Sequence, residues 1–238
     1  MKISAEYESW LEKNFGKDII LKQNRLVSRM TYETVIPESI SIPSKMYPLE
    51  GEGDIEIFTT YNTKKLDDEQ IRKIYDETEF KHGNCYSNSK RLLNNLRSAG
   101  VNDVYAYVGW FYNCTDDRPV HHCALVYQGK YMLDMSSDSG IEELKSVRAN
   151  SKDEIREIIA KRYVDRLKNM KASERTCFGD MMQGSLFIAK RLSPEDGASF
   201  FFEKLIKIYP NHPSYRNVIT SNGATKTQVM IQNLLKRP

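Results

Sequence analysis

The feature that most constrains the fold of this 238-residue chain is a helix pattern followed at once by three strand patterns. The run Cys85–Ala99 is amphipathic and is followed by Gly100, which is typical of a helix C-terminus. Strands are then predicted at Val104–Phe111, Val120–Tyr127 and Tyr131–Met135. Only Gln128–Gly129–Lys130 separates the last two, which predicts an antiparallel hairpin. We therefore expect a helix packed on an antiparallel sheet at the centre of the fold.

Helical patterns dominate the chain on both sides of this segment. Before it, helices are predicted at Ala5–Asn14 and Asp67–Glu77, and short strands at Ile19–Leu21 and Ile55–Thr60. After it, capping patterns at Ser151 and Ser193 start two helices, and a last helix follows Gly223. The sequence therefore predicts an α+β fold. Residues 1–140 would hold the helix–sheet core with an N-terminal extension, and residues 141–238 a basic helical region, packed separately or within the same domain.

The net charge of +3 is the sum of two unlike halves. Residues 141–238 carry 18 Lys and Arg against 11 Asp and Glu, a net charge of +7, so residues 1–140 carry −4. The preferred interpretation of the basic half is a solvated helical surface, and the alternative is contact with an acidic partner. Nucleic acid is not the expected partner, because the basic residues of Ser151–Lys171 are mixed with acids and the chain has no glycine-rich phosphate loop.

The sequence also predicts a location. Residues Met1–Gly16 mix charged with apolar residues and lack the apolar core of a secretory signal. The most apolar later stretch, Phe200–Ile208, contains three charged residues and cannot span a bilayer. We expect a cytoplasmic protein, of the producing cell or of a host cell, with no membrane partner and with reduced cysteines.

Cys85 lies where a helix can activate a thiol. Ser89, Leu92 and Leu96 follow it at helical spacing, so Cys85 begins the face that is expected to pack on the sheet. The first turn of a helix offers unpaired N–H groups and the positive end of the helix dipole, which favour a thiolate. Cys85 is therefore the candidate nucleophile.

His122 and Asp134 complete a candidate catalytic triad. His122 shares one face of its strand with Ala124, whereas His121 points to the other face. Centring the turn near Gln128–Gly129 predicts that Asp134 lies roughly opposite His122. The carboxylate would orient the imidazole, which would accept the thiol proton. His121 is the alternative base, and His122 is preferred because the small Ala124 lets the helix end approach its face.

Two segments resemble a known enzyme superfamily. Gly83-Asn84-Cys85-Tyr86-Ser87 resembles the Gly-x-Cys-aromatic-Ser/Ala entry of papain-like cysteine peptidases. The segment from His122 to Asp134 resembles the His-strand, Gly-turn, strand-Asp element of the transglutaminase-like branch. The resemblance covers about residues 78–136, and it implies a papain/transglutaminase-like core that forms a thioester at Cys85.

The sequence departs from the superfamily pattern at two positions. Glu79 stands where papain-like enzymes have the glutamine of the oxyanion hole. Ala124 replaces the aromatic residue found two residues after the histidine in the transglutaminase-like branch. An oxyanion hole would then use the Cys85 backbone N–H with a second donor, such as Asn84 or Asn88.

The expected function is cysteine-dependent acyl transfer that cleaves or modifies an amide bond in a protein or peptide, without a cofactor. Hydrolysis is ranked slightly ahead of transfer to an amine, and glutamine deamidation, transglutamination and acetyl transfer would use the same three groups. The alternative is a noncatalytic binding protein on the same scaffold, whose basic C-terminal half contacts an acidic protein or nucleic acid.

Zinc binding is the rival chemistry. Six residues could supply four ligands: His82, Cys85, Cys114, His121, His122 and Cys123. However, adjacent strand residues point to opposite faces, and the chain has no Cys-x-x-Cys pair, so no metal site is expected. The remaining cysteines are interpreted as structural: Cys114, Cys123 and Cys177.

Overall fold

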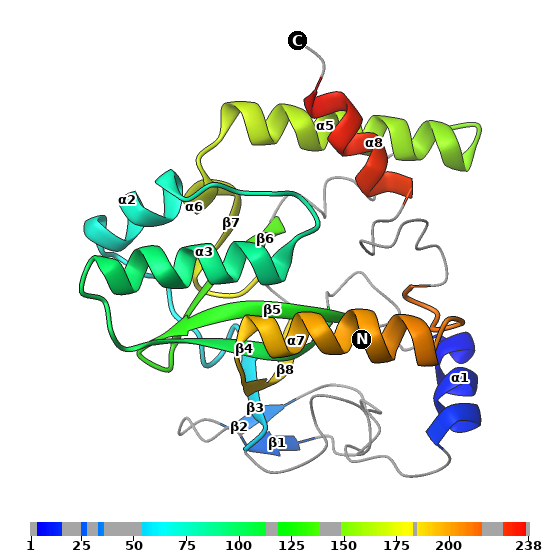
Figure 1. Ribbon diagram of the computed structural model, residues 1–238, viewed down its shortest axis with the longest axis horizontal. Coiled ribbons are helices and arrows are strands. Elements are labelled where there is room, and N and C mark those ends of the chain that lie inside the picture. The colour runs from blue at the N-terminus through cyan, green and yellow to red at the C-terminus, as the bar shows by residue number, and fades with distance from the viewer. Residues whose placement is uncertain are drawn as a thin grey trace.

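A six-stranded antiparallel sheet forms the centre of the computed structural model, with the strand order β3-β8-β4-β5-β6-β7 (Figure 1). The structure describes residues 4–15, 25–27, 33–35, 54–112, 119–138, 149–182, 185–215 and 226–236. The strands of the sheet are β3 (Glu56–Thr59), β4 (Val104–Tyr112), β5 (Val120–Tyr127), β6 (Tyr131–Asp138), β7 (Thr176–Gly179) and β8 (Leu186–Arg191). A second, two-stranded sheet pairs β1 (Arg25–Val27) with β2 (Glu33–Val35).

The helices agree closely with the predicted ones and confirm the α+β class. They are α1 (Ala5–Phe15), α2 (Glu69–Glu77), α3 (Cys85–Ser98), α5 (Lys152–Asn169), α6 (Ala172–Arg175), α7 (Pro194–Phe200) and α8 (Lys226–Leu235). A π-helical segment, η1 (Phe201–Ile206), directly continues α7. The predicted caps are present, because Ser151 and Ser193 accept hydrogen bonds from the backbone N–H groups of Glu154 and Asp196. The predicted strand Ile19–Leu21 lies outside the described residues.

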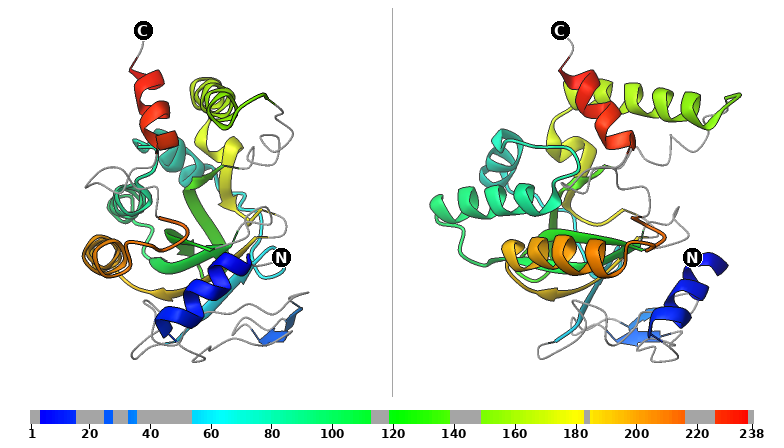
Figure 2. Two further views of the ribbon diagram at one scale, coloured as in Figure 1. Left: turned by 90° about the vertical axis from the view of Figure 1, so that its right-hand side faces the viewer. Right: turned by 45° about the vertical axis from the view of Figure 1, so that its right-hand side comes forward.

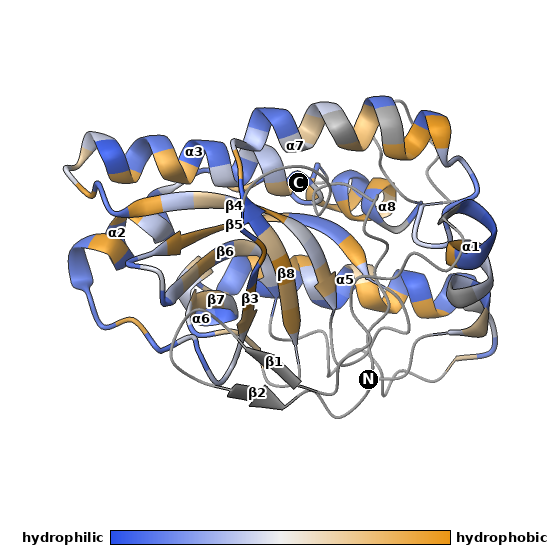
Figure 3. Ribbon diagram, turned by 90° about the horizontal axis from the view of Figure 1, so that it is seen from below, coloured by the Kyte–Doolittle hydropathy of each residue, from blue (hydrophilic) through white to orange (hydrophobic). Residues whose placement is uncertain are grey.

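Two helices, α3 and α7, lie side by side on one face of the sheet (Figure 2). Leu92 and Leu96 on the inner side of α3 pack with one apolar side chain from each of β4, β5 and β6: Ala106, Leu125 and Leu133. Gly197 allows α7 to approach closely, because a Cβ there would meet Tyr86 Cε1 at 2.7 Å and Val108 Cγ1 at 2.8 Å. Apolar residues concentrate in the sheet, while the outward sides of the helices are largely hydrophilic (Figure 3).

Residues 141–238 are not wholly helical, which corrects the prediction. They supply the strands β7 and β8, and β8 lies between β3 and β4, so both halves of the chain build one sheet. The segment Leu186–Arg191 is buried at every residue except the last. A strand buried on both faces has no alternation of apolar and polar residues, and this is why the sequence pattern did not reveal it.

The predicted hairpin of β5 and β6 is present, with a register different from the predicted one. Its turn has positive φ at Gln128 (50°) and Gly129 (65°), and Tyr127 pairs with Tyr131. The pairing ends with Leu125 opposite Leu133, one or two residues further along β6 than predicted. If this register continued, Ser136 would face His122, and Asp134 would be its diagonal neighbour.

The helices α5 and α8 pack against each other through a small apolar cluster that includes Ala160, Val164 and Ile231. A buried ion-pair network ties α5 to the sheet, because Asp138 of β6 contacts Arg166 Nη2 at 3.0 Å and Arg175 Nη1 at 3.6 Å. Within the part of the chain that the structure describes, no helix is both long and apolar enough to cross a membrane.

Candidate active site

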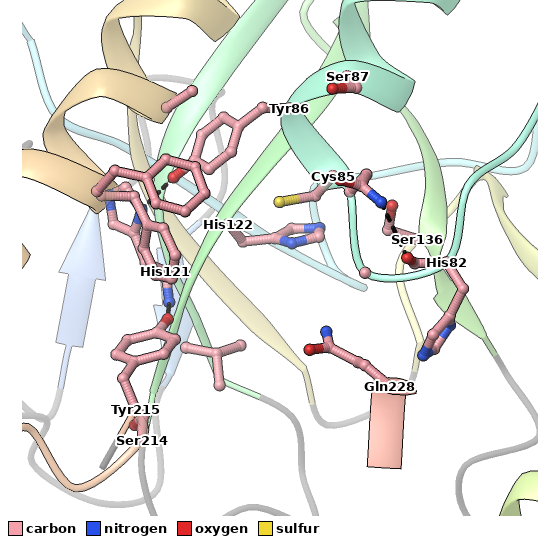
Figure 4. Close-up of a pocket in the computed structure, with 16 residues that line it drawn as sticks. His82, Cys85, Tyr86, Ser87, His121, His122, Ser136, Ser214, Tyr215 and Gln228 are labelled. Atoms are coloured by element: carbon pink, nitrogen blue, oxygen red, sulfur yellow. Dashed lines mark hydrogen bonds between the residues drawn. The ribbon is translucent and has the colours of Figure 1, made fainter. Parts of the chain in front are cut away.

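A cavity of about 350 Å³ opens at the start of α3 (Figure 4). Two of the three predicted triad residues, Cys85 and His122, line it, together with the predicted oxyanion donor Asn84. Segments far apart in the sequence meet here, because the cavity is also lined by Ala198 of α7 and Gln228 of α8. Both the N-terminal and the C-terminal half of the chain therefore supply residues to the lining of the cavity.

Cys85 is the first residue of α3, as predicted, and it is half-buried. Its sulfur lies beside the ring of His122 (Figure 4), and this proximity helps to raise the pKa of the imidazole. The first turn of α3 contains no acidic residue that would oppose a thiolate. Among the described residues, the other free cysteines, Cys123 and Cys177, are buried, and burial raises the pKa of each thiol.

His122 is hydrogen bonded to Asp134 through its Nε2 atom. His122 Nε2 lies 2.6 Å from Asp134 Oδ2, and both side chains are buried. This contact occupies Nε2, so Nδ1 is the ring nitrogen left for the Cys85 thiol. Cys85, His122 and Asp134 thus lie next to one another in the predicted order, with a hydrogen bond between the imidazole and the carboxylate.

Asp134 is held by the segment of β6 that follows it. The backbone N–H of Ser136 donates to Asp134 Oδ1 at 2.9 Å, and the Ser137 hydroxyl donates to Oδ2. The register of β6 against β7 shifts between Asp134 and Asp138, so these residues lie in an irregular part of the strand. Such irregularities commonly re-aim side chains beside active sites. Here the irregular segment supplies two donors to the carboxylate.

The charges in this group are strongly coupled. Burial disfavours the His122 imidazolium, but the Asp134 carboxylate and the contact with Cys85 raise the pKa of His122 to about 10. Burial would raise the pKa of Asp134, but the contact with His122 and the donors of Ser137 and Ser136 lower it. At neutral pH the pair is therefore an imidazolium and a carboxylate.

The alternative base, His121, has different surroundings. Its Nδ1 is hydrogen bonded to the Tyr86 hydroxyl, and its backbone N–H donates to the Tyr215 hydroxyl. Its ring stacks on that of Phe201, with centroids 5.9 Å apart. Burial, with the nearby His122 and His212, lowers the pKa of His121 to about 3, so the ring is neutral at physiological pH. His121 thus anchors the start of α3 to β5.

The reason given for preferring His122 is wrong, although His122 is the histidine beside Cys85. The helix α3 packs on the face of the sheet that carries Leu125, whereas Ala124 lies in the cluster on the opposite face. The small size of Ala124 therefore does not admit the helix. His122 and Asp134 both lie beyond the paired part of β5 and β6, and the ring reaches Cys85 at this open end of the hairpin.

The two predicted oxyanion donors differ in their surroundings. Asn84 is exposed, and its side chain donates to the His82 carbonyl at 3.1 Å. Asn88 is buried, and its amide donates to the Lys81 carbonyl at 2.9 Å and to Ser136 Oγ at 3.2 Å. Both amide hydrogens of Asn88 are thereby used, so this residue holds the loop before Cys85 instead of presenting a donor to the cavity.

The sequence patterns did not reveal the cavity residues that come from the C-terminal half. They are Ala198, Phe201, Phe202, Ser214, Tyr215 and Gln228. Gln228 approaches Gly83 so closely that a Cβ on that glycine would lie 2.6 Å from Gln228 Nε2. The cluster of three phenylalanines was visible in the sequence, but it gave no information on which segment it would face.

The described residues contain no group of three or more His, Cys, Asp or Glu side chains that could hold a metal ion. His82, which was considered as a zinc ligand, packs its ring on that of Tyr163 with centroids 4.7 Å apart. Cys114, another residue of that set, lies outside the described residues.

Comparisons of the chain with protein-family models, with curated proteins and with solved structures give no match.

Proposed function

We propose that this protein is a cysteine-dependent enzyme that cleaves or modifies an amide bond of a protein or peptide through a thioester at Cys85. One observation carries the proposal: a half-buried cysteine at the start of a helix lies beside a histidine in one cavity, and that histidine is hydrogen bonded to a buried carboxylate. Nucleophile, base and orienting group in this order are the arrangement that acyl transfer by cysteine requires.

The first half of the reaction forms the thioester. The Cys85 sulfur attacks the carbonyl carbon of the amide, a C–S bond forms, and an electron pair moves to the carbonyl oxygen. The oxyanion then collapses and the C–N bond breaks. The departing nitrogen takes a proton from the His122 imidazolium, so the amine leaves in neutral form. The backbone N–H groups of the first turn of α3 would stabilise the oxyanion.

The second half of the reaction releases the acyl group. The neutral His122 now accepts a proton from water or from an amine as that molecule attacks the thioester carbonyl. The C–S bond breaks, and the Cys85 thiolate and the His122 imidazolium are restored. Asp134 keeps the ring in position and stabilises its charged form throughout. We rank water ahead of an amine as the acceptor, which makes the protein a hydrolase.

The second hypothesis is a noncatalytic binding role for the basic C-terminal half. Several basic side chains of that half are already paired within the molecule: Arg156 with Asp153, Lys161 with Glu157, and Arg166 and Arg175 with Asp138. Asp153 and Glu157 are already counted in the net charge of +7, so only the pairing with Asp138 of the acidic half reduces the excess positive charge. Binding of an acidic protein that weakens steeply with salt would support the second hypothesis.

The test of the enzyme proposal is the rate at which iodoacetamide alkylates Cys85, measured by mass spectrometry. At about pH 6 a free cysteine thiol is largely protonated, so a thiolate paired with His122 should react at least about tenfold faster than free cysteine. The variant His122→Ala should lose about tenfold or more of that rate. Ser98→Ala, an exposed change at the far end of α3, is the matched control and should react like the wild type.

Two results would contradict the proposal. One is a wild-type rate no higher than that of free cysteine. The other is a folded His122→Ala variant that reacts as fast as the wild type. His122→Gln, which keeps a polar side chain at this buried position, serves as the second variant in case the alanine variant does not fold.

A further inference from the structure

The cavity beside Cys85 has two chemically different sides. One side carries the Cys85 sulfur, the His122 ring and the hydroxyl of Ser136 (Figure 4). The other side is apolar and comes mainly from the C-terminal half of the chain. We call it the apolar wall, and it consists of Val120, Ala198, Phe201, Phe202 and Tyr215.

The apolar wall is built by the π-helical segment η1 and the helix before it. Ala198, Phe201 and Phe202 lie three and four residues apart, so they present one side of the helix to the cavity. The Phe201 ring packs edge-to-face on Tyr215 with centroids 4.9 Å apart, and on Phe202 with centroids 5.3 Å apart. Short π-helical turns are rare and occur frequently at functional sites. These contacts fix the shape of the wall.

Apart from the His122 imidazolium, which is already bound to Asp134, the cavity offers no counter-charge to a charged side chain that would lie against the wall. No Asp, Glu, Lys or Arg is among the lining residues in the described part of the chain. The two other histidines of the lining are neutral at physiological pH, because burial lowers the pKa of His82 to about 4 and that of His121 to about 3. A charged group placed there would lose its hydration without gaining a partner.

We propose that the acyl part of the substrate carries a large uncharged side chain, aromatic or branched aliphatic, which packs on the apolar wall. This inference rests on the proposed function, since it concerns the group bound to Cys85. An acyl carbon attached to the Cys85 sulfur must lie in this cavity, and the side chain next to that carbon is then within reach of Phe201 and Phe202. Burial of such a side chain would contribute most of the selectivity among substrates.

The test uses N-acetyl amino acid chloromethyl ketones with the side chains of Phe, Leu, Gly, Asp and Lys. In each case the Cys85 sulfur displaces chloride, one C–S bond forms, and chloride leaves. We expect the Phe and Leu reagents to inactivate the protein about ten- to a hundredfold faster than the Gly reagent. The Asp and Lys reagents should be no faster than the Gly reagent. Every rate is divided by the iodoacetamide rate of the same protein.

Variants in α7 and η1 test whether the preference for the Phe reagent comes from the apolar wall. Ala198→Leu fills the space in front of the wall and Phe202→Ala removes part of it, so each should lower the normalised rate of the Phe reagent by about tenfold. Ser199→Leu is the matched control, because Ser199 is an exposed neighbour of Ala198 on the same turn, and it should leave that rate unchanged.

The results separate this inference from the proposed function. If iodoacetamide labels Cys85 quickly but all five ketones react equally, or the charged ones react fastest, the apolar wall does not select the substrate and the enzyme proposal stands. If Ser199→Leu lowers the rate as much as Ala198→Leu, the wall is again refuted. If no reagent labels Cys85 faster than free cysteine, the enzyme proposal fails, and this inference fails with it.

Discussion

Adjacent histidines on β5 are driven to opposite protonation states by their neighbours. His122 faces the Asp134 carboxylate, and its pKa rises to about 10. His121 faces aromatic rings and the hydroxyl of Tyr86, and its pKa falls to about 3. Both rings are buried, so burial does not explain the difference. The carboxylate next to only one of them explains it, because it compensates the imidazolium charge.

Replacement of Asp134 by Asn should reverse the charge state of His122. Without the carboxylate, burial dominates and disfavours the imidazolium, so the His122 pKa should fall from about 10 to below the ordinary histidine value of 6.5. The ring would then be neutral at about pH 8, where the wild-type ring is charged. Nitrogen-15 NMR of the imidazole as a function of pH measures this directly.

The control for this titration is Ser87→Ala, which changes an exposed hydroxyl near Cys85 and keeps the carboxylate. It should leave the His122 titration in place. A His122 ring that remains charged at the same pH in the Asp134→Asn variant would mean that another group stabilises the imidazolium.

The proximity of Cys85, His122 and Asp134 could be predicted from the sequence because their spacing follows from local geometry. The start of a helix and the period of a strand fix where Cys85, His122 and Asp134 point within a few residues. The contacts of Asn88 and Gln228 could not be predicted in this way. They depend on how a loop folds back on α3 and on where α8 docks, and neither leaves a periodic pattern in the sequence.

At the scale of elements, hydrogen bonds of the Asn88 side chain hold the start of α3 in place. Its amide oxygen accepts a hydrogen bond from the backbone N–H of Lys81 at 2.9 Å. Its amide nitrogen donates to the Lys81 carbonyl and to Ser136 Oγ. The Arg91 guanidinium also donates to Asn88 Oδ1 at 2.7 Å. One side chain thereby connects the loop before Cys85, the helix itself and the irregular part of β6. It keeps nucleophile and carboxylate in a fixed relation.

The variant Asn88→Ala should therefore destabilise the protein. Loss of the amide removes its hydrogen bonds with the N–H and the carbonyl of Lys81. Each bond contributes about 0.5–1.5 kcal/mol, so the two together should cost about 1–3 kcal/mol of unfolding free energy. Urea denaturation measures this cost. A direct oxyanion role for Asn88 would instead lower the rate of thioester formation and leave the unfolding free energy unchanged.

Asn94→Ala is the matched control, because Asn94 is an exposed asparagine of the same helix. Its unfolding free energy should change by less than about 0.5 kcal/mol. Equal stability of the Asn88 and Asn94 variants would show that the loop before Cys85 does not depend on the buried amide.

The helices and most strands of the sheet were predictable, but the register and two strands were not. Amphipathic periods and caps gave the bounds of α2, α3 and α5 to within two residues. The register of β5 and β6 depends on the φ angles of the turn at Gln128 and Gly129, which the sequence does not state. β7 is only four residues long and β8 is buried on both faces, so neither shows the period of a half-exposed strand.

At the scale of the whole molecule, the acidic and basic halves are joined by buried charges. Asp138 belongs to the acidic half, and its partners Arg166 and Arg175 belong to the basic half. The sheet is shared in the same way, since β8 of the second half lies between β3 and β4 of the first. The charge asymmetry of the sequence is thus partly an internal complementarity, which a count of charges along the chain could not reveal.

Asp138→Asn should weaken the ion pairs that connect the two halves of the chain. The change leaves Arg166 and Arg175 without this carboxylate in a buried place, which should lower the unfolding free energy by about 3 kcal/mol. Asp153→Asn is the control, because it breaks an exposed ion pair with Arg156 and should cost less than about 1 kcal/mol. Chemical denaturation compares the two, and a loss for Asp138→Asn no larger than that of the control would contradict the role of the network.

The place of β8 in the sheet has a consequence for how the protein is made. A ribosome releases Cys85 about 100 residues before β8, and residues translated at about 5–20 per second leave a gap of roughly 5–20 s. Until β8 has emerged, β3 and β4 lack the strand that joins them, and the apolar wall completed by Tyr215 emerges still later. The growing chain thus exposes Cys85 for several seconds before the strand and the aromatic side chains that complete the cavity around it have been made.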